Sequence, residues 1–382
     1  MALVMVLLSA FCFAGCSKDQ AEGEKIPELP GLEYESTTPL KYANQFAIHK
    51  FKGGYSYIDI VNGTKVLVVP EGKEVPEGLA DDVTVVKQPV SSLYMAATSS
   101  MSLIGAMEAY DKVGFSCLEK GKWNLEGVNQ LMEEGKILYA GKYSAPDYET
   151  LLEKGCNLAI ESTMIYHTPE VSEKLQELGI SVIVEHSSYE NHPLGRTEWI
   201  KVYGAILGRE KEAEAAFEKE DAMLSDMKVA AAGSEGQNVD GGQKKVAFFY
   251  INSMGNVVTY KSDGYAAAMI QLAGGSYVPA GITGDNKLST LNMSMEDFYA
   301  AAADADVLIY NSSIVNELQT LDQLRELSAV LGEFKAVKSG EVWCTSKSMF
   351  QQTDKMGSII KEMNAIISGE NQQELKYMHK LH

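Results

Sequence analysis

Basic residues are few for a chain of this length. The 382 residues include 33 Lys and Arg against 52 Asp and Glu, which gives a formal net charge of −19. Binding to nucleic-acid phosphates needs clustered Lys and Arg side chains. The charge balance therefore argues against a nucleic-acid partner, and a well-solvated acidic surface is enough to explain it.

Cysteine is also scarce. Of the five cysteines, two lie in the apolar N-terminal stretch, and the other three show no C-x-x-C spacing. An odd number without that spacing indicates neither a disulfide framework nor a metal-binding motif. We predict that Cys117, Cys156 and Cys344 are buried free thiols, with one disulfide among them as the alternative.

No segment after Cys16 is apolar enough to cross a membrane. The run Ala2–Phe13 is apolar, but a membrane-spanning helix needs about 20 residues. It suits a secretory signal instead. The "FAGC" sequence followed by Ser17 resembles a bacterial lipoprotein box, so we predict a lipoprotein signal peptide over 1–15 and acylation of Cys16.

This prediction places the mature chain outside the cytoplasm, anchored to the cell membrane by its lipid. Two acyl chains would anchor it stably, because each buried CH₂ contributes about 0.8 kcal/mol. An ordinary cleaved signal and a buried N-terminal helix are the alternatives. Residues 16–34 are polar with two prolines and are predicted to be a flexible tether.

Common catalytic and nucleotide-binding motifs are missing as well. The sequence contains no G-x-S-x-G elbow, no Walker A loop, no G-x-G-x-x-G after a strand and no H-E-x-x-H. We therefore expect a protein that is not an enzyme and has no intrinsic cofactor. An exported hydrolase remains a less favoured alternative, since it would need a nucleophile and a base within hydrogen-bond reach.

What the sequence does contain is an alternation of short strands and helices. Three β-rich segments, "QFAIHKF", "YSYIDIV" and "KVLVVP", come first, and an Asn-Gly pair after the second predicts a hairpin. Strand and helix patterns then alternate as far as "SVIVE", which predicts parallel βαβ units. The pattern resumes at "KKVAFFYI" and continues to a closing helix.

A long helix is predicted between these two halves. Pro193 is favoured at a helix start, and the helical pattern continues to about Ala231. Such a helix would be roughly 50 Å long. Trp199, Tyr203 and Phe217 recur at helical spacing and are expected to face the body of the protein.

Candidate ligand contacts follow the predicted strands, because ligands bind at the carboxyl ends of parallel strands. Arg196, near the start of the long helix, suits a carboxylate or phosphate, with a surface ion pair as the alternative. Each of the others has a loop or core role as its alternative. The other candidates are Tyr94, Thr98, Ser99, Met164, Tyr166, His167, His186, Tyr260, Met349 and Phe350.

A metal site is a second possibility at these strand ends. His167 and His186 follow neighbouring predicted strands, and histidine is the commonest metal ligand. Together with Glu161 or Glu185 they would hold a bare Zn, Mn or Fe ion. A binding protein for such an ion is the alternative function.

Several segments between Val83 and Ile367 resemble the solute-binding lipoproteins of ABC importers for iron chelates and cobalamin. "YGAILGREKEAEA" is similar to that family's "GxLLGxExEAE" helix, and "AVKSGEVWCTS" is similar to its "AVKxGxVY" element. "MIQLAGG" matches "LAGG" before the second-lobe binding loop. "APDYETLLEKGCNLAI" is similar to another element, although Asn157 and Cys156 replace its usual Asp and Pro.

The resemblance implies an α/β fold of two Rossmann-like lobes, 35–190 and 233–382. A single long helix over 191–232 would join them, with the ligand cleft between the lobes. It implies capture of an iron chelate (siderophore or haem) or a corrinoid, and delivery to an ABC permease and its ATPase. Glu149 and Glu296 would dock to that permease, and Tyr166 or His167 would be able to ligate an iron centre directly.

Overall fold

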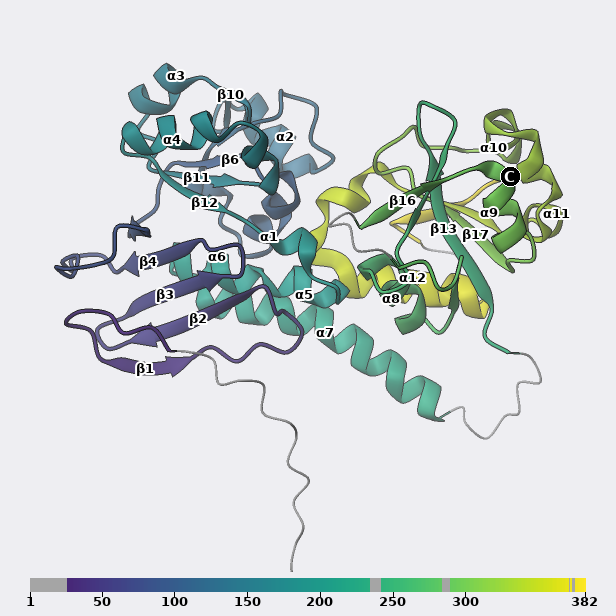
Figure 1. Ribbon diagram of the computed structural model, residues 1–382, viewed down its shortest axis with the longest axis horizontal. Helices are drawn as coiled ribbons and strands as arrows, with labels where there is room; N and C mark the ends of the chain where they lie inside the picture. The colour runs from purple at the N-terminus through teal and green to yellow at the C-terminus, as the bar shows by residue number, and fades with distance from the viewer. Residues whose placement is uncertain (1–25, 234–241, 284–288, 371, 373–374) are drawn as a thin grey trace, which may run out of the picture.

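Two α/β lobes lie side by side, and helices along their base connect them (Figure 1). The computed structural model describes residues 26–233, 242–283, 289–370, 372 and 375–382. The predicted signal peptide, Cys16 and the tether as far as residue 25 lie outside the described residues. The α/β fold class predicted from the sequence is confirmed.

The N-terminal lobe contains a parallel sheet with strand order β12-β11-β6-β7-β8. Each strand except the edge strand β8 is followed by a helical segment, as the βαβ pattern predicts. The strands are β6 (Leu93–Met95), β7 (Val113–Ser116), β8 (Leu138–Tyr139), β11 (Leu158–Glu161) and β12 (Ser181–Val184), and the helices are α1 (Met101–Ala106), α2 (Glu126–Glu133), α3 (Tyr148–Glu153) and α4 (Pro169–Glu177).

A second sheet precedes this one and packs below it in Figure 1. The three strands predicted first are present, and the sheet gains one strand at each side. Gly63 has a φ of 92° at the predicted Asn-Gly turn, a conformation that glycine adopts without strain. The strands are β1 (Tyr34–Thr37), β2 (Phe46–Phe51), β3 (Tyr55–Ile60), β4 (Lys65–Val69) and β5 (Val83–Lys87), antiparallel except for the β4–β5 pair.

The C-terminal lobe has one mixed sheet with order β16-β14-β13-β17-β18-β19, and β15 also pairs with β13. Strands β13, β15, β17 and β18 are parallel, and β14, β16 and β19 are antiparallel to their neighbours. The elements are β13 (Lys245–Ile251), β14 (Val257–Tyr260), α8 (Tyr265–Leu272), β15 (Ser276–Val278), β16 (Thr290–Met293), α9 (Met295–Ala302), β17 (Val307–Tyr310), α10 (Leu321–Leu327), α11 (Lys335–Ser339), β18 (Val342–Thr345), α12 (Met356–Ser368) and β19 (Met378–Lys380).

The connection between the lobes is not the single helix predicted over 191–232. It consists of α5 (Pro193–Glu198), α6 (Ile200–Leu207) and α7 (Glu210–Gly233). Gly208 ends α6 in the left-handed conformation, with a φ of 67°. The helical periodicity continues across this corner, and the periodicity alone therefore does not reveal it.

A hydrophobic core runs through both lobes and the connecting helices. The same cluster of buried side chains includes Leu93 in the N-terminal lobe, Trp199 at the junction and Ile360 in α12. The three predicted thiols, Cys117, Cys156 and Cys344, are buried and free. In the described part of the chain, no helix is both long and apolar enough to span a bilayer.

The corner between α6 and α7 depends on a close approach at Gly204. A Cβ atom added there would lie 2.7 Å from the Cβ of Ala213 and 3.3 Å from the backbone of Arg209 and Glu210. We expect Gly204→Ala to lower the free energy of unfolding by about 1–3 kcal/mol through overpacking, measured by denaturant titration. The control is Gly127→Ala in α2, where the added Cβ would meet only a side-chain atom at 3.6 Å.

Because alanine suits a helix better than glycine, the control should be neutral or stabilising by about 0.5–1 kcal/mol. Equal effects of the two substitutions would show that the corner is not tightly packed.

Candidate functional site

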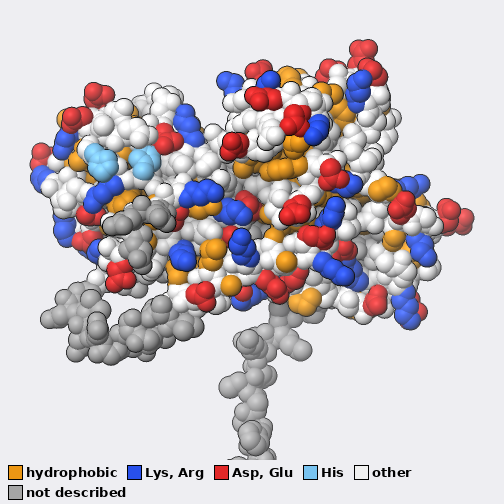
Figure 2. Space-filling model, turned by 180° about the vertical axis from the view of Figure 1, so that it is seen from behind, with side chains coloured by type: hydrophobic (Ala, Val, Ile, Leu, Met, Phe, Trp, Pro, Cys, Tyr) orange, Lys and Arg blue, Asp and Glu red, His pale blue; other side chains and the backbone are white. Residues whose placement is uncertain are grey.

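A cavity of about 340 Å³ lies between the two lobes. Seen from behind, the surface of the molecule is hollowed at this junction (Figure 2). The N-terminal wall is built from residues that follow β6, β11 and β12, and the opposite wall from residues that follow β17 and β18. Both walls therefore lie at carboxyl ends of parallel strands, where ligands bind in α/β folds.

A second cavity of about 300 Å³ adjoins the first, and Ser188, Arg196 and Tyr265 line both. The carbon at the centre of the Arg196 guanidinium lies 3.6 Å from the centroid of the Tyr265 ring. This cation–π contact joins α5 to the first residue of α8 in the C-terminal lobe. The interlobe cleft therefore consists of two chambers that meet at the Arg196–Tyr265 contact.

Arg196 has donor capacity that the protein does not use. Its Nη2 donates to the carbonyl oxygen of Ser188 at 2.6 Å. Its Nε is buried and, among the described residues, has no acceptor. A buried N–H without a partner costs about 1–3 kcal/mol, so an acceptor brought by a ligand would remove that cost.

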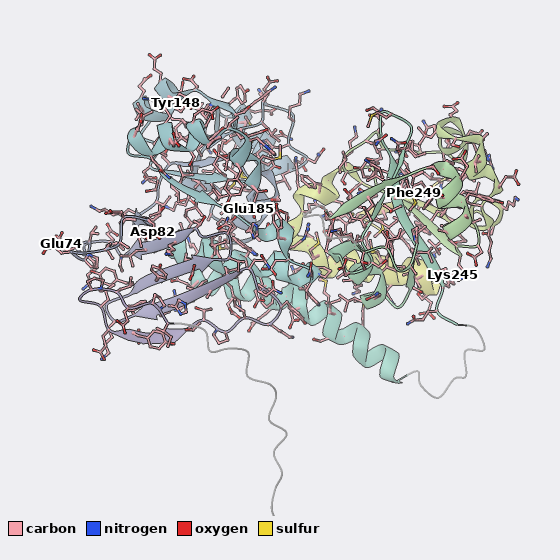
Figure 3. The ribbon with its side chains drawn as sticks, viewed as in Figure 1. Glu74, Asp82, Tyr148, Glu185, Lys245 and Phe249 are labelled. Atoms are coloured by element: carbon pink, nitrogen blue, oxygen red, sulfur yellow. The ribbon has the colours of Figure 1, made fainter. Side chains whose placement is uncertain are left out.

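Glu185 forms part of the floor of the first chamber and is only 3% exposed. It lies close to the junction of the lobes (Figure 3). Its carboxylate accepts the backbone N–H of Ser187 at 2.8 Å and the hydroxyl of Ser99 at 3.3 Å. Burial raises the pKa of Glu185, whereas these hydrogen bonds and the charge of Arg196 act in the opposite direction.

The remaining wall combines apolar and polar side chains. Met164 of the N-terminal lobe and Phe350 of the C-terminal lobe both line the cavity and are 47% and 51% exposed. Asn311 also lines the cavity, and its Nδ2 donates to the hydroxyl of Tyr260 at 2.6 Å. The chamber therefore offers polarizable surface and hydrogen-bonding groups to one ligand.

The structure brings part of the predicted ligand-contact set to this cavity. The predicted residues that line it are Thr98, Ser99, Met164, Arg196, Met349 and Phe350. Of these, Arg196 also lines the second chamber. Their role in binding stays a prediction.

Other predicted residues do not reach the cavity walls. Tyr94 is fully buried in the N-terminal lobe and donates to the carbonyl oxygen of Gly141 at 3.0 Å. It lies within the strand rather than after it, so it faces the core. Tyr260 is likewise buried, behind Asn311.

The predicted metal ligands do not converge. Tyr166 and His167 are exposed to solvent and do not line the cavity, whereas Ser162, Thr163 and Met164 just before them do. His186 instead stacks on Tyr189, with ring centroids 3.9 Å apart, and its Nδ1 lies 3.1 Å from Oε1 of Gln45. The described residues contain no group of three His, Cys, Asp or Glu that could hold a metal ion.

Some residues of the cavity were not predicted. The sequence indicates Glu185 only as a metal ligand and does not indicate Tyr265, Thr353 or Met356. No local pattern indicates Tyr265, because it begins a helix and meets Arg196 only through the packing of the two lobes. Thr353, in the turn before α12, and Met356, the first residue of α12, reach the cavity in the same way.

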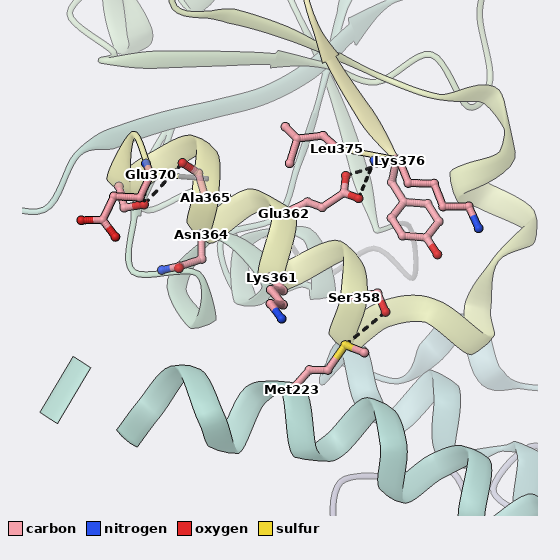
Figure 4. A pocket seen from close by; sticks show the side chains of 11 residues that line it. Met223, Ser358, Lys361, Glu362, Asn364, Ala365, Glu370, Leu375 and Lys376 are labelled. Carbon is pink, nitrogen blue, oxygen red and sulfur yellow. Dashed lines mark hydrogen bonds between the residues drawn. The ribbon is translucent and has the colours of Figure 1, made fainter. Parts of the chain in front are cut away.

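A further hollow of about 360 Å³ lies away from the cleft, between α7 and α12 (Figure 4). Several of its polar side chains are already paired within the fold, among them Glu362, Ser358 and Asn364. Glu362 accepts the backbone N–H groups of Lys376 at 2.7 Å and of Tyr377 at 2.8 Å. Ser358 donates its backbone N–H to Glu220 at 2.8 Å. The interlobe cavity is thus the better candidate site.

The two predicted docking glutamates are exposed in the first turns of short helices. Glu149 lies in α3, which Asp147 caps by accepting the N–H of Thr150. Glu296 lies in α9, which Ser294 caps by accepting the N–H of Asp297. Both carboxylates are therefore available to a partner, one on each lobe.

Comparisons with known proteins bear on the fold. No family model matches the sequence. Two uncharacterized lipoproteins of Methanocaldococcus jannaschii are similar to the chain. One is 27% identical in sequence, and the match covers 85% of this chain and 80% of the relative. The other is 24% identical, and the match covers 97% of this chain and 95% of the relative.

Solved structures of periplasmic binding proteins share the fold. A periplasmic haem-binding protein from Pseudomonas aeruginosa gives a TM-score of 0.59 at 14% identity, covering 76% of this chain and 98% of that chain. A periplasmic catecholate-siderophore binding protein from Vibrio cholerae gives a TM-score of 0.55 at 13% identity, and the match covers 73% of this chain and 95% of that chain. The chain therefore has the two-lobed fold of these proteins, as the sequence resemblance implied.

Glu161, the other carboxylate considered for a metal, is fully buried, and neither of its oxygens has a partner among the described residues. Burial raises the pKa of Glu161 to about 8, from an ordinary value of 4.5. The folded protein therefore keeps this proton between those two pH values, while the unfolded chain loses it. Stability should fall as the pH rises through this window.

We expect Glu161→Gln, which carries no such proton, to stabilise the protein more at pH 8 than at pH 5. The free energy of unfolding of the variant minus that of the wild type should be larger at pH 8 than at pH 5 by on the order of 1–3 kcal/mol. Denaturant titrations of both proteins at both pH values measure it. A gain that is the same at both pH values would contradict a protonated, buried Glu161.

Proposed function

We propose that this protein is the extracytoplasmic substrate-binding component of an ABC importer. It captures a metal chelate of the siderophore, haem or corrinoid class between its lobes and delivers it to the permease and its ATPase. The two-chambered cavity at the Arg196–Tyr265 contact is the observation that carries the proposal. The fold shared with a haem-binding and a catecholate-siderophore binding protein supports it.

The chemistry of the cavity supports a large ligand with an anionic group. Met164, Met349 and Phe350 supply polarizable and aromatic surface for a partly apolar ring system or ligand frame. Arg196 supplies a cation whose Nε lacks an acceptor, and guanidinium groups suit carboxylates and other oxyanions. The proposed role is capture and delivery of the ligand, without chemistry on it.

The N-terminus supports attachment to the membrane. The "FAGC" box predicts a lipid on Cys16, and the two relatives from Methanocaldococcus jannaschii are named lipoproteins. The tether would let the lobes reach the permease while the lipid stays in the bilayer. A binding protein for a bare metal ion is less well supported, because His167 and His186 lie apart from the cavity.

The test is a titration of the purified protein with haemin, a ferric tris-catecholate, a ferric trihydroxamate and cyanocobalamin, followed by absorbance. We expect one of them to bind, and Arg196→Gln to weaken it by about 10–100-fold, the cost of losing a charge-assisted hydrogen bond. The control is Arg209→Gln, because Arg209 is paired with Glu212 at 3.1 Å outside the cleft.

Arg209→Gln should leave the affinity unchanged. Failure of every chelate to bind, combined with stabilisation of the fold by Zn²⁺ or Mn²⁺, would replace this proposal with the bare-metal alternative.

The exposed glutamates of α3 and α9 give a second prediction. In a cell that depends on this importer, the double variant Glu149→Arg, Glu296→Arg should reduce uptake of the chelate at least tenfold, because like charges would then oppose cationic permease residues. Its affinity for the chelate should not change. Glu170→Arg, in the first turn of α4, is the control and should transport normally; loss of affinity in the double variant would place these residues in the ligand site instead.

A further inference from the structure

The segment between β1 and β2 crosses the connecting helices as a strap, defined here as residues 38–45. Its backbone N–H groups from residue 41 to residue 45 all donate to carboxylates. Lys41, Tyr42 and Ala43 donate to Glu198 at 2.8, 2.8 and 2.9 Å. Asn44 and Gln45 donate to Glu190 at 3.0 Å each.

Both acceptors are buried carboxylates, and Glu190 also lines the second chamber. Glu198 is fully buried and Glu190 is 2% exposed. Glu190 also accepts Nε1–H of Trp199 at 3.0 Å, and Glu198 pairs with Nζ of Lys201 at 3.2 Å. Taking such charges out of water is costly unless hydrogen bonds compensate the loss of hydration. The N–H groups of the strap supply these hydrogen bonds, and the carboxylates in turn supply acceptors for the N–H groups.

Side chains of the strap extend this attachment. Tyr42 stacks on His192, the N-cap of α5, with ring centroids 4.0 Å apart. Its hydroxyl donates to Asp221 of α7 at 2.7 Å, and Nζ of Lys41 reaches the same carboxylate. The strap thus joins the start of α5 to the middle of α7.

The attachment has a direct route to the ligand site. Glu198 lies two residues after Arg196 in the single short helix α5, and Glu190 lies two residues after Ser188, whose carbonyl oxygen holds the Arg196 guanidinium. Gly195 of α5 packs closely against both Glu190 and the strap. A Cβ atom added to it would lie 3.1 Å from Oε2 of Glu190 and 3.3 Å from the carbonyl oxygen of Tyr42. The strap therefore packs directly against the helix that carries Arg196.

We propose that Glu198 and Glu190 are positioning residues for ligand binding, which act by fixing α5 against the strap and so hold Arg196 over Tyr265. This gives the N-terminal sheet a function, because the sheet fixes both ends of the strap. The proposal rests on the proposed function, in which Arg196 contacts the chelate. It predicts an energetic coupling between Glu198 and Arg196 that a merely stabilising residue would not show.

The test is a double-mutant cycle on the full chain with haemin as the probe. If haemin does not bind, the probe is whichever of the ferric tris-catecholate, the ferric trihydroxamate and cyanocobalamin does. Glu198→Gln places an amide with one acceptor oxygen against three backbone donors. We expect it to weaken binding about tenfold in the wild-type background and less than twofold when Arg196→Gln is already present. Glu198→Asp keeps the carboxylate but moves it away from the strap, because the side chain is one CH₂ shorter. It should weaken binding in the same way but less, and it replaces Glu198→Gln if that variant does not fold.

Glu362→Gln is the matched control. Glu362 accepts two consecutive backbone N–H groups, those of Lys376 and Tyr377, but lies at the hollow between α7 and α12. It should leave the affinity unchanged. An equal loss of affinity from Glu198→Gln in both backgrounds, or no loss at all, would overturn the proposal.

A measurement without ligand separates this proposal from the proposed function. If the wild type binds none of the four chelates, the proposed function loses its support, and hydrogen exchange of the free protein then tests the strap. Glu198→Gln should speed exchange of the amides of residues 185–199 at least tenfold, and Glu362→Gln should not. Unchanged exchange in Glu198→Gln would show that the strap does not fix α5.

Discussion

The position of α5 depends on one arrangement: consecutive backbone N–H groups of the strap donate to two buried carboxylates. Neither partner is stable alone, since unpaired N–H groups and buried charges are both costly. Glu198 and Glu190 therefore specify where α5 lies, and α5 carries Arg196. The contact of Arg196 with Tyr265, at which the two chambers meet, depends on that placement.

The same region limits how the lobes can move. A continuous core passes from the N-terminal lobe through Trp199 to α12. Hydrogen bonds also cross the junction, from the hydroxyl of Thr197 to the carbonyl oxygen of Thr353 and from the backbone N–H of Asn124 to Gln351. A packed junction of this kind favours a small closure around a ligand over a wide hinge motion.

Sequence patterns predict the parts of this structure that depend on local order. Alternating strands and helices, the Asn-Gly hairpin and the strand-end positions of Thr98, Ser99, Met164 and Met349 are local features, and they are found as predicted. The corner at Gly208 is missed because helical periodicity continues through it. Tyr265 and the strap are missed because they are brought to Arg196 only by contacts between residues far apart in the chain, such as Tyr42 with Glu198.

In the proposed function the chelate lies at the junction of the two chambers, and a crystal structure of the protein with its bound chelate tests this most directly. The result expected is a chelate between the lobes, with an oxygen of the ligand accepting a hydrogen bond from Arg196 and with residues of both walls in contact. A chelate bound in the hollow between α7 and α12, or held by one lobe without Arg196, would contradict this placement of the ligand.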